Sequence, residues 1–286
     1  MHCANAQNWR RWQIPCPFLV PWRRCVHSSR TSLGVDDPLG WAFGDVHGDD
    51  YTLRRLAVDY RLAVINYEYR LAPEHPFPTA PDDCFKAFKY FAANPDLLSA
   101  DFSKGLIVGG SSAGANLAAV LVHLVRDDPH LKDTPITGQL LVIPALVHPK
   151  AYPEKFKSSL LSMEQNKDAP ILPKAMIETF YNWYKAVPTD PKTSPLLYPS
   201  HEGLPPAYFQ ICGLDPLRDE GLLYEKILKQ VGVRTKLEVY PGVPHGFLSV
   251  ARDITLGKKY LNDFRLGVEW LLREGLSKQS FLAARG

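Results

Sequence analysis

The chain has 286 residues, of which 45% are hydrophobic and 22% charged, proportions ordinary for a globular protein with a sizeable core. A net charge of +3 gives no strong field for nucleic acid or an acidic membrane surface, and no apolar run reaches the roughly 18 residues of a membrane span. The five cysteines have no C-x-x-C spacing, which argues against a disulfide framework or zinc site and favours free thiols in a reducing, cytoplasmic compartment.

A basic segment opens the chain. Residues 1–35 contain five arginines and no acidic residue. Such a composition is typical of a mitochondrial transit peptide, but Pro15, Pro17 and Pro21 oppose the amphipathic helix that such a peptide needs. We therefore interpret residues 1–36 as an atypical basic extension that precedes the folded domain.

Strand-like and helix-like stretches alternate from about residue 56 onward. Short apolar runs predict strands, and longer amphipathic or apolar runs predict helices, the last of them ending at Gly275. The predicted strands cover 62–69, 105–110, 138–146, 207–213 and 235–242, and the predicted helices cover 113–128, 219–233 and 258–275. The alternation predicts an α/β fold with a mainly parallel sheet and helices on both faces, spanning residues 37–275, with a tail at 276–286.

One long segment interrupts the alternation. Residues 147–206 are rich in proline and too long for a simple connection, so we predict a lid beside the active site, with a helix at 172–187. Its aromatic side chains are candidates for lining a pocket for an apolar substrate; alternatively, they only anchor the helix to the body. These aromatic residues are Phe180, Tyr181, Trp183 and Tyr184.

A candidate nucleophile lies between the predicted strand 105–110 and helix 113–128. The sequence Gly110-Ser-Ser-Ala-Gly114 fits the pattern G-x-S-x-G only when Ser112 is its centre. At a strand-to-helix turn this pattern predicts a nucleophile elbow, in which small neighbours allow close packing and the hydroxyl stands clear of the sheet. Ser111 is interpreted as a turn residue.

A serine nucleophile needs a base, which an acid in turn orients. In this architecture the acid and then the base follow later strands in the chain. Asp215 follows the strand 207–213, and His245 follows the strand 235–242. Asp219 is the competing acid, but its position predicts a residue of the next helix's first turn. Ser112, His245 and Asp215 are therefore the predicted catalytic residues.

Four stretches together resemble the hormone-sensitive-lipase group of α/β-hydrolase esterases. They are YRLAPEHPFPTAPDD (69–83), GGSSAGANLAA (109–119), GLDPLRDEG (213–221) and PHGF (244–247). The resemblance covers about residues 40–275 and implies a serine carboxylesterase without a metal or organic cofactor. The sequence of residues 195–247 further resembles that of fungal members that remove acetyl groups in polyketide pathways, which implies a role in secondary metabolism.

The chain departs from this group where an H-G-G-G-W motif normally supplies oxyanion donors. Asp37 to Trp41 read D-P-L-G-W, so the donors implied by the resemblance fall on Leu39 and Gly40, beside the N–H of Ala113. Trp41 joins the candidate substrate-binding residues. The group also has further amino-terminal strands, which we do not find in residues 1–36, so we expect these edge strands to be missing or atypical.

These observations predict hydrolysis of a short-chain ester of a small apolar or aromatic molecule by a monomer or homodimer, and acetyl is the expected acyl group. Two alternatives remain open. The first is a catalytically impaired hydrolase fold that only binds a small ligand, for which the altered oxyanion segment is the main argument. The second is cleavage of an amide, because the same triad also serves that reaction.

Overall fold

The computed structural model describes residues 14–15, 17–20, 40–42, 50–98 and 100–283. Its centre is a six-stranded parallel sheet in the order β3-β2-β5-β6-β7-β8. The strands are β2 (Pro17–Val20), β3 (Ala63–Asn66), β5 (Ile107–Ser111), β6 (Gly138–Val142), β7 (Ala207–Cys212) and β8 (Thr235–Tyr240). Two short strands, β1 (Ile14–Pro15) and β4 (Ala100–Asp101), pair separately in parallel. The predicted parallel α/β fold is confirmed.

Strand β2 corrects our interpretation of the amino-terminal segment. It lies inside the sheet, where Pro17 pairs with Ala63 of β3 and Phe18 pairs with Ile107 of β5. Two of the prolines that oppose a helix here are compatible with short strands, because Pro15 ends β1 and Pro17 begins β2. The folded domain therefore includes residues that we had assigned to an extension.

The strand order reverses direction between β2 and β5. From β2 the chain moves outward to β3, and from β5 it moves the other way through β6 and β7 to β8. In open parallel sheets such a reversal leaves a crevice at the carboxyl ends of the strands, which is where ligands bind. The candidate nucleophile Ser112 follows β5 at this point.

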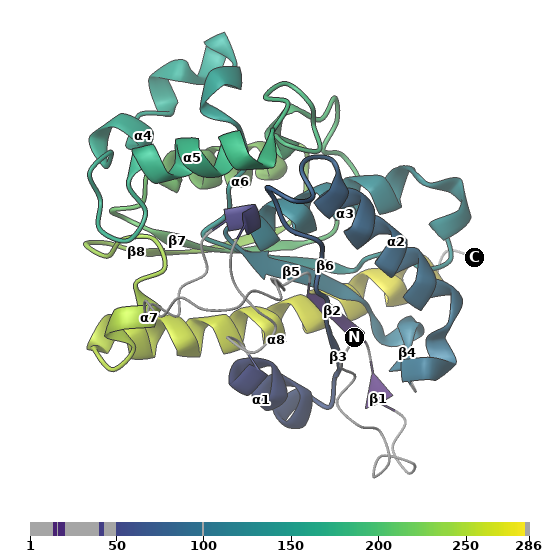
Figure 1. The fold of residues 1–286 in the computed structure, drawn as a ribbon. Helices are drawn as coiled ribbons and strands as arrows, with labels where there is room; N and C mark the ends of the chain where they lie inside the picture. The colour runs from purple at the N-terminus through teal and green to yellow at the C-terminus, as the bar shows by residue number, and fades with distance from the viewer. Residues whose placement is uncertain (1–13, 16, 21–39, 43–49, 99, 284–286) are drawn as a thin grey trace.

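Helices cover both faces of the sheet (Figure 1). Alternate residues of the central strands belong to different core clusters, one on each face. Val108 and Leu141 belong to the cluster shared with helices α2, α3 and α6, whereas Ile107 and Leu140 belong to the cluster shared with α1 and α8. This period of two is expected for strands that are buried on both faces. The helices are α1 (Asp50–Tyr60), α2 (Thr79–Ala93), α3 (Ala113–Asp127), α6 (Arg218–Gln230) and α8 (Thr255–Ala283).

Helix α8 is longer than the sequence predicts, since it continues beyond Gly275 instead of ending there. The glycine has a packing role: a Cβ at residue 275 would lie 2.9 Å from Oγ1 and 3.0 Å from Cβ of Thr137. Absence of a side chain thus lets the helix pass close to the residue that precedes β6. The prediction that Gly275 ends the helix is therefore wrong, and the glycine is needed for this close contact instead.

The segment between β6 and β7 forms short helices that lie over the edge of the sheet where the strands have their carboxyl ends (Figure 1). Its two α-helices are α4 (Ser162–Gln165) and α5 (Lys174–Tyr184), the second of which is the helix predicted at 172–187. After β8 comes the short helix α7 (Leu248–Ala251). The short 3₁₀ helices are η2 (Gly40–Ala42), η3 (Pro95–Leu98), η4 (Phe102–Lys104), η5 (Pro129–Leu131), η6 (Pro149–Ala151), η7 (Glu154–Ser159) and η8 (Pro195–Leu197).

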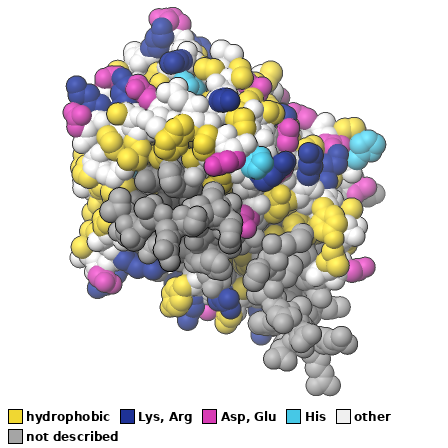
Figure 2. Space-filling model, viewed as in Figure 1, with side chains coloured by type: hydrophobic (Ala, Val, Ile, Leu, Met, Phe, Trp, Pro, Cys, Tyr) yellow, Lys and Arg dark blue, Asp and Glu magenta, His cyan; other side chains and the backbone are white. Residues whose placement is uncertain are grey.

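Charged side chains of both signs are interspersed over the described surface in Figure 2, in keeping with the small net charge. Within the described ranges, no helix combines the length and apolar character required to cross a membrane.

Candidate active site

The turn after β5 holds Ser112 in an unusual backbone conformation. Its φ of 53° and ψ of −117° are rarely adopted by residues other than glycine. Helix α3 begins at the next residue, and the N–H of Ser112 donates to the Val142 carbonyl across the ends of β5 and β6. These features are those of a nucleophile elbow. Ser111 is the last residue of β5, not a turn residue as expected.

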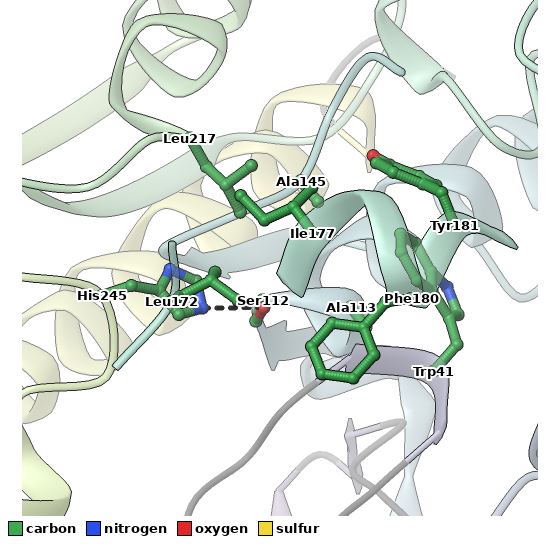
Figure 3. Close-up of a pocket in the computed structure, with 10 residues that line it drawn as sticks. All are labelled: Trp41, Ser112, Ala113, Ala145, Leu172, Ile177, Phe180, Tyr181, Leu217 and His245. Atoms are coloured by element: carbon green, nitrogen blue, oxygen red, sulfur yellow. Dashed lines mark hydrogen bonds between the residues drawn. The ribbon is translucent and has the colours of Figure 1, made fainter. Parts of the chain in front are cut away.

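The three predicted catalytic residues form one chain of hydrogen bonds. His245 Nε2 lies 2.9 Å from Ser112 Oγ, and His245 Nδ1 lies 2.7 Å from Asp215 Oδ2. Figure 3 shows the first of these bonds. The three side chains come from the loops after β5, β7 and β8, and each is at most 5% exposed. Burial strengthens these contacts, because water does not compete for the same donors and acceptors.

The Asp215 side chain is held by its own loop. Its Oδ1 accepts the N–H of Leu217 at 2.8 Å, which leaves Oδ2 directed at the imidazole. Helix α4 also contacts this loop, because Asn166 Nδ2 donates to the Asp215 carbonyl and Ser162 Oγ donates to the Pro216 carbonyl.

Asp219 takes a different role from Asp215. It lies in the first turn of α6, as predicted, and its Oδ2 accepts the N–H groups of Leu161 and Ser162 at the start of α4. Its carboxylate therefore fastens the segment between β6 and β7 to the acid-bearing loop and does not contact the imidazole of His245 in the part of the chain that is described.

A small pocket opens beside Ser112 (Figure 3). Its volume is about 20 Å³, little more than the roughly 10–15 Å³ that one water molecule requires. The walls are almost entirely apolar. The lining residues are Trp41, Ser112, Ala113, Ala145, Leu172, Ile177, Phe180, Tyr181, Leu217 and His245.

The predicted substrate-binding residues divide into two groups. Trp41, Phe180 and Tyr181 line the pocket, whereas Trp183 and Tyr184 do not. Trp183 is 39% exposed because it lies on the outer side of α5, and Tyr184 is fully buried beneath Trp41, with ring centroids 4.6 Å apart and nearly parallel planes. Tyr184 thus anchors α5 to the body, which was our alternative interpretation for these aromatics.

Four lining residues were missed by sequence reasoning: Ala145, Leu172, Ile177 and Leu217. They are ordinary aliphatic residues, and nothing in their sequence context separates a pocket wall from a core position. Ile177 had a usable signal, since it lies three and four residues before Phe180 and Tyr181 and therefore shares their helix face.

The predicted oxyanion donors are only partly described. Ala113 is the first residue of α3, so its N–H belongs to the helix terminus next to Ser112, where developing negative charge is favoured. Gly40 is the first residue of η2, and the neighbouring Trp41 reaches the pocket. Leu39 lies outside the described residues.

Glu220 is a buried acid near the site that sequence reasoning did not single out. It is 1% exposed, and its Oε2 accepts the N–H groups of Leu146 and Val147 beyond the end of β6. Burial raises the pKa of Glu220 to about 8, although these two hydrogen bonds oppose the shift. The available signal was its place in the GLDPLRDEG stretch.

Comparison with known proteins agrees with this geometry. Residues 40–249 match a family model described as an alpha/beta hydrolase fold. The chain is 35% identical over 247 residues to versiconal hemiacetal acetate esterase of Dothistroma septosporum, covering 85% of this chain and 74% of the relative. It is 36% identical over 243 residues to carboxylesterase NlhH of Mycobacterium tuberculosis, covering 82% and 72%.

A solved structure extends the likeness to three dimensions. The crystal structure of vibralactone cyclase superposes with a TM-score of 0.83 at 39% identity, covering 92% of this chain and 72% of that one. The chain therefore belongs to the α/β-hydrolase family. Within this family it belongs to the hormone-sensitive-lipase-like group, whose relatives identify it as a carboxylic ester hydrolase.

Proposed function

We propose that this protein hydrolyses short-chain esters of small apolar or aromatic molecules through a triad of Ser112, His245 and Asp215. The hydrogen-bond chain from Ser112 Oγ through the imidazole to Asp215 Oδ2 carries the proposal. A serine hydroxyl is a weak nucleophile at its ordinary pKa, so a base within hydrogen-bond reach and an acid that orients this base supply the activation that the reaction needs.

In the proposed reaction, His245 Nε2 accepts the proton of Ser112 Oγ as this oxygen attacks the ester carbonyl. Asp215 holds the other ring nitrogen and stabilises the imidazolium that forms. The N–H of Ala113, with donors from Gly40 and Leu39, stabilises the oxyanion. The alcohol leaves with the proton from His245, and water then cleaves the acyl-enzyme by the same steps, releasing the acid and restoring the serine.

The pocket supports a short acyl group. A volume of about 20 Å³ is little more than one water molecule requires, which favours a small acyl group, and apolar walls disfavour a charged one. The likeness to versiconal hemiacetal acetate esterase makes an acetylated aromatic polyketide of mycotoxin biosynthesis the candidate natural substrate, with versiconal hemiacetal acetate as the specific compound to test. We further propose that residues 147–206 act as a lid over this pocket.

Replacement of Ser112 tests the proposed function. S112A is expected to lower kcat on p-nitrophenyl acetate by about 10⁴-fold or more, because the attacking oxygen is lost. The circular dichroism spectrum and melting temperature of the variant serve as the control for folding. Wild-type turnover by a folded S112A variant would refute the triad assignment.

A further inference from the structure

The pocket wall at Ala145 belongs to a buried, irregular segment that follows β6. Three consecutive backbone N–H groups in this segment donate to side chains instead of to a strand. Those of Leu146 and Val147 donate to Glu220 Oε2, the second at 2.7 Å, and that of His148 donates to Ser194 Oγ at 2.9 Å. Buried backbone N–H groups without a partner are costly, so these side chains determine where the segment lies.

A second buried side chain also holds this segment. The carbonyl of Ala145 accepts a hydrogen bond from Asn116 Nδ2 at 2.8 Å. Asn116 is fully buried, and its own N–H donates to the Ser112 carbonyl at 3.0 Å. The segment at Ala145 is therefore hydrogen-bonded both to α3, which begins directly after the nucleophile, and to α6, which begins three residues after Asp215.

We propose that Glu220 is a positioning residue that, together with Asn116, fixes the Ala145 wall of the pocket relative to Ser112 and thereby limits the length of the acyl group. The inference deepens the proposed ester hydrolysis and rests on it. Glu220 acts through the backbone of residues 146 and 147, which directly follow the wall residue, and it does not itself line the pocket.

Helix α6 supplies a matched control in Glu225. This residue is likewise buried, at 5% exposed, but its carboxylate contacts Thr235 Oγ1 at 2.5 Å and Lys229 Nζ at 2.7 Å. These partners lie on β8 and α6 and do not line the pocket. Loss of Glu225 therefore disturbs the same helix without releasing the Ala145 wall.

The experiment compares kcat/KM for p-nitrophenyl acetate and p-nitrophenyl hexanoate in wild type, E220A, E220Q and E225A. In E220A two backbone donors lose their acceptor and the wall relaxes, so the acetate-to-hexanoate ratio is expected to fall about tenfold. E220Q retains an oxygen that accepts both N–H groups and is expected to stay within about twofold of the wild-type ratio. E225A is expected to keep this ratio even if its melting temperature falls.

A wild-type ratio in folded E220A would overturn the inference while leaving ester hydrolysis intact, and absence of hydrolysis by the wild type would instead overturn the proposed function. If E220A does not fold, N116A releases the same wall from α3 and is expected to lower the ratio in the same direction. An unchanged ratio in N116A would then overturn the inference.

Discussion

Two buried histidines away from the active site share a hydrogen bond. His123 Nδ1 lies 2.7 Å from the Ala119 carbonyl, and its Nε2 lies 3.0 Å from His201 Nδ1. His201 is also hydrogen-bonded to the backbone of Leu196, a contact that favours its charged form. A neutral imidazole carries only one N–H, so the hydrogen bond between the two rings needs one ring nitrogen as donor and the other as acceptor. The pair is thus a site where burial and hydrogen bonding oppose one another.

Burial dominates this competition, which makes stability depend on pH. It lowers the pKa of His123 to about 3 and also lowers that of His201, whereas both titrate near 6.5 in the unfolded chain. Between these values the unfolded chain binds more protons, so the free energy of unfolding falls as pH decreases below about 6.5. Stabilisation by the neutral pair is complete above this pH.

Urea titrations between about pH 5 and 7 measure this dependence. We expect a loss of up to roughly 1.4 kcal/mol per pH unit for each histidine that remains neutral in the folded state. His148, whose pKa burial lowers to about 4, contributes with the same sign, whereas the raised pKa of Glu220 contributes with the opposite sign. A stability that rises on acidification through this range would show that the histidines are not buried as neutral groups.

The junction of β5 and α3 is the element that the proposed reaction depends on most. A Cβ at Gly110 would lie 2.3 Å from the carbonyl carbon of Gly114 and 2.8 Å from the nitrogen of Ala115, both of them backbone atoms. Because neither can move aside alone, a side chain here would separate the strand from the helix and displace Ser112.

G110A is therefore expected to lose about 10²-fold or more in kcat, since a displacement of about 1 Å suffices for such a loss. G232A is the control, because Gly232 has a φ of 80° but nothing within 4 Å of an added Cβ. It is expected to lose roughly 1–2 kcal/mol of stability and to keep its activity. Equal activity of the two variants on p-nitrophenyl acetate would contradict a tightly packed elbow.

Sequence patterns predict most of the helices and strands and miss those features whose signal is not local in the chain. The five runs from residue 62 onward correspond to β3, β5, β6, β7 and β8. The signal is strongest for β5, β6 and β7, because strands buried on both faces read as continuous apolar runs. Strand β2 is only four residues long and lies among prolines and arginines. Gly275 reads as a helix end because its contact with Thr137 comes from a distant part of the chain.

Across the whole molecule, 133 residues separate Ser112 from His245, and the parallel topology returns both to one edge of the sheet. Strand order and motif context sufficed to predict this meeting, since each residue follows a strand. The pocket walls were not predictable in the same way. Trp183 and Phe180 both look suitable in sequence, but Phe180 lines the pocket whereas Trp183 is exposed. The difference follows from the packing of α5 on Trp41 through Tyr181 and Tyr184.

Whether the protein is an enzyme or only binds a ligand depends on the catalytic triad and the oxyanion segment together. The binding alternative rests on the altered segment around Leu39 and Gly40, whereas the hydrogen-bonded arrangement of Ser112, His245 and Asp215 supports an activated nucleophile. A fluorophosphonate separates the two, because its phosphorus is attacked only by an activated serine and its adduct mimics the tetrahedral intermediate.

The most direct test of the central claim is the mass spectrum of the whole chain and its peptides after treatment with such a fluorophosphonate. We predict a single adduct on Ser112, absent from S112A and formed far more slowly by an H245A variant. An unlabelled wild-type chain, or an adduct that persists in S112A, would contradict the account.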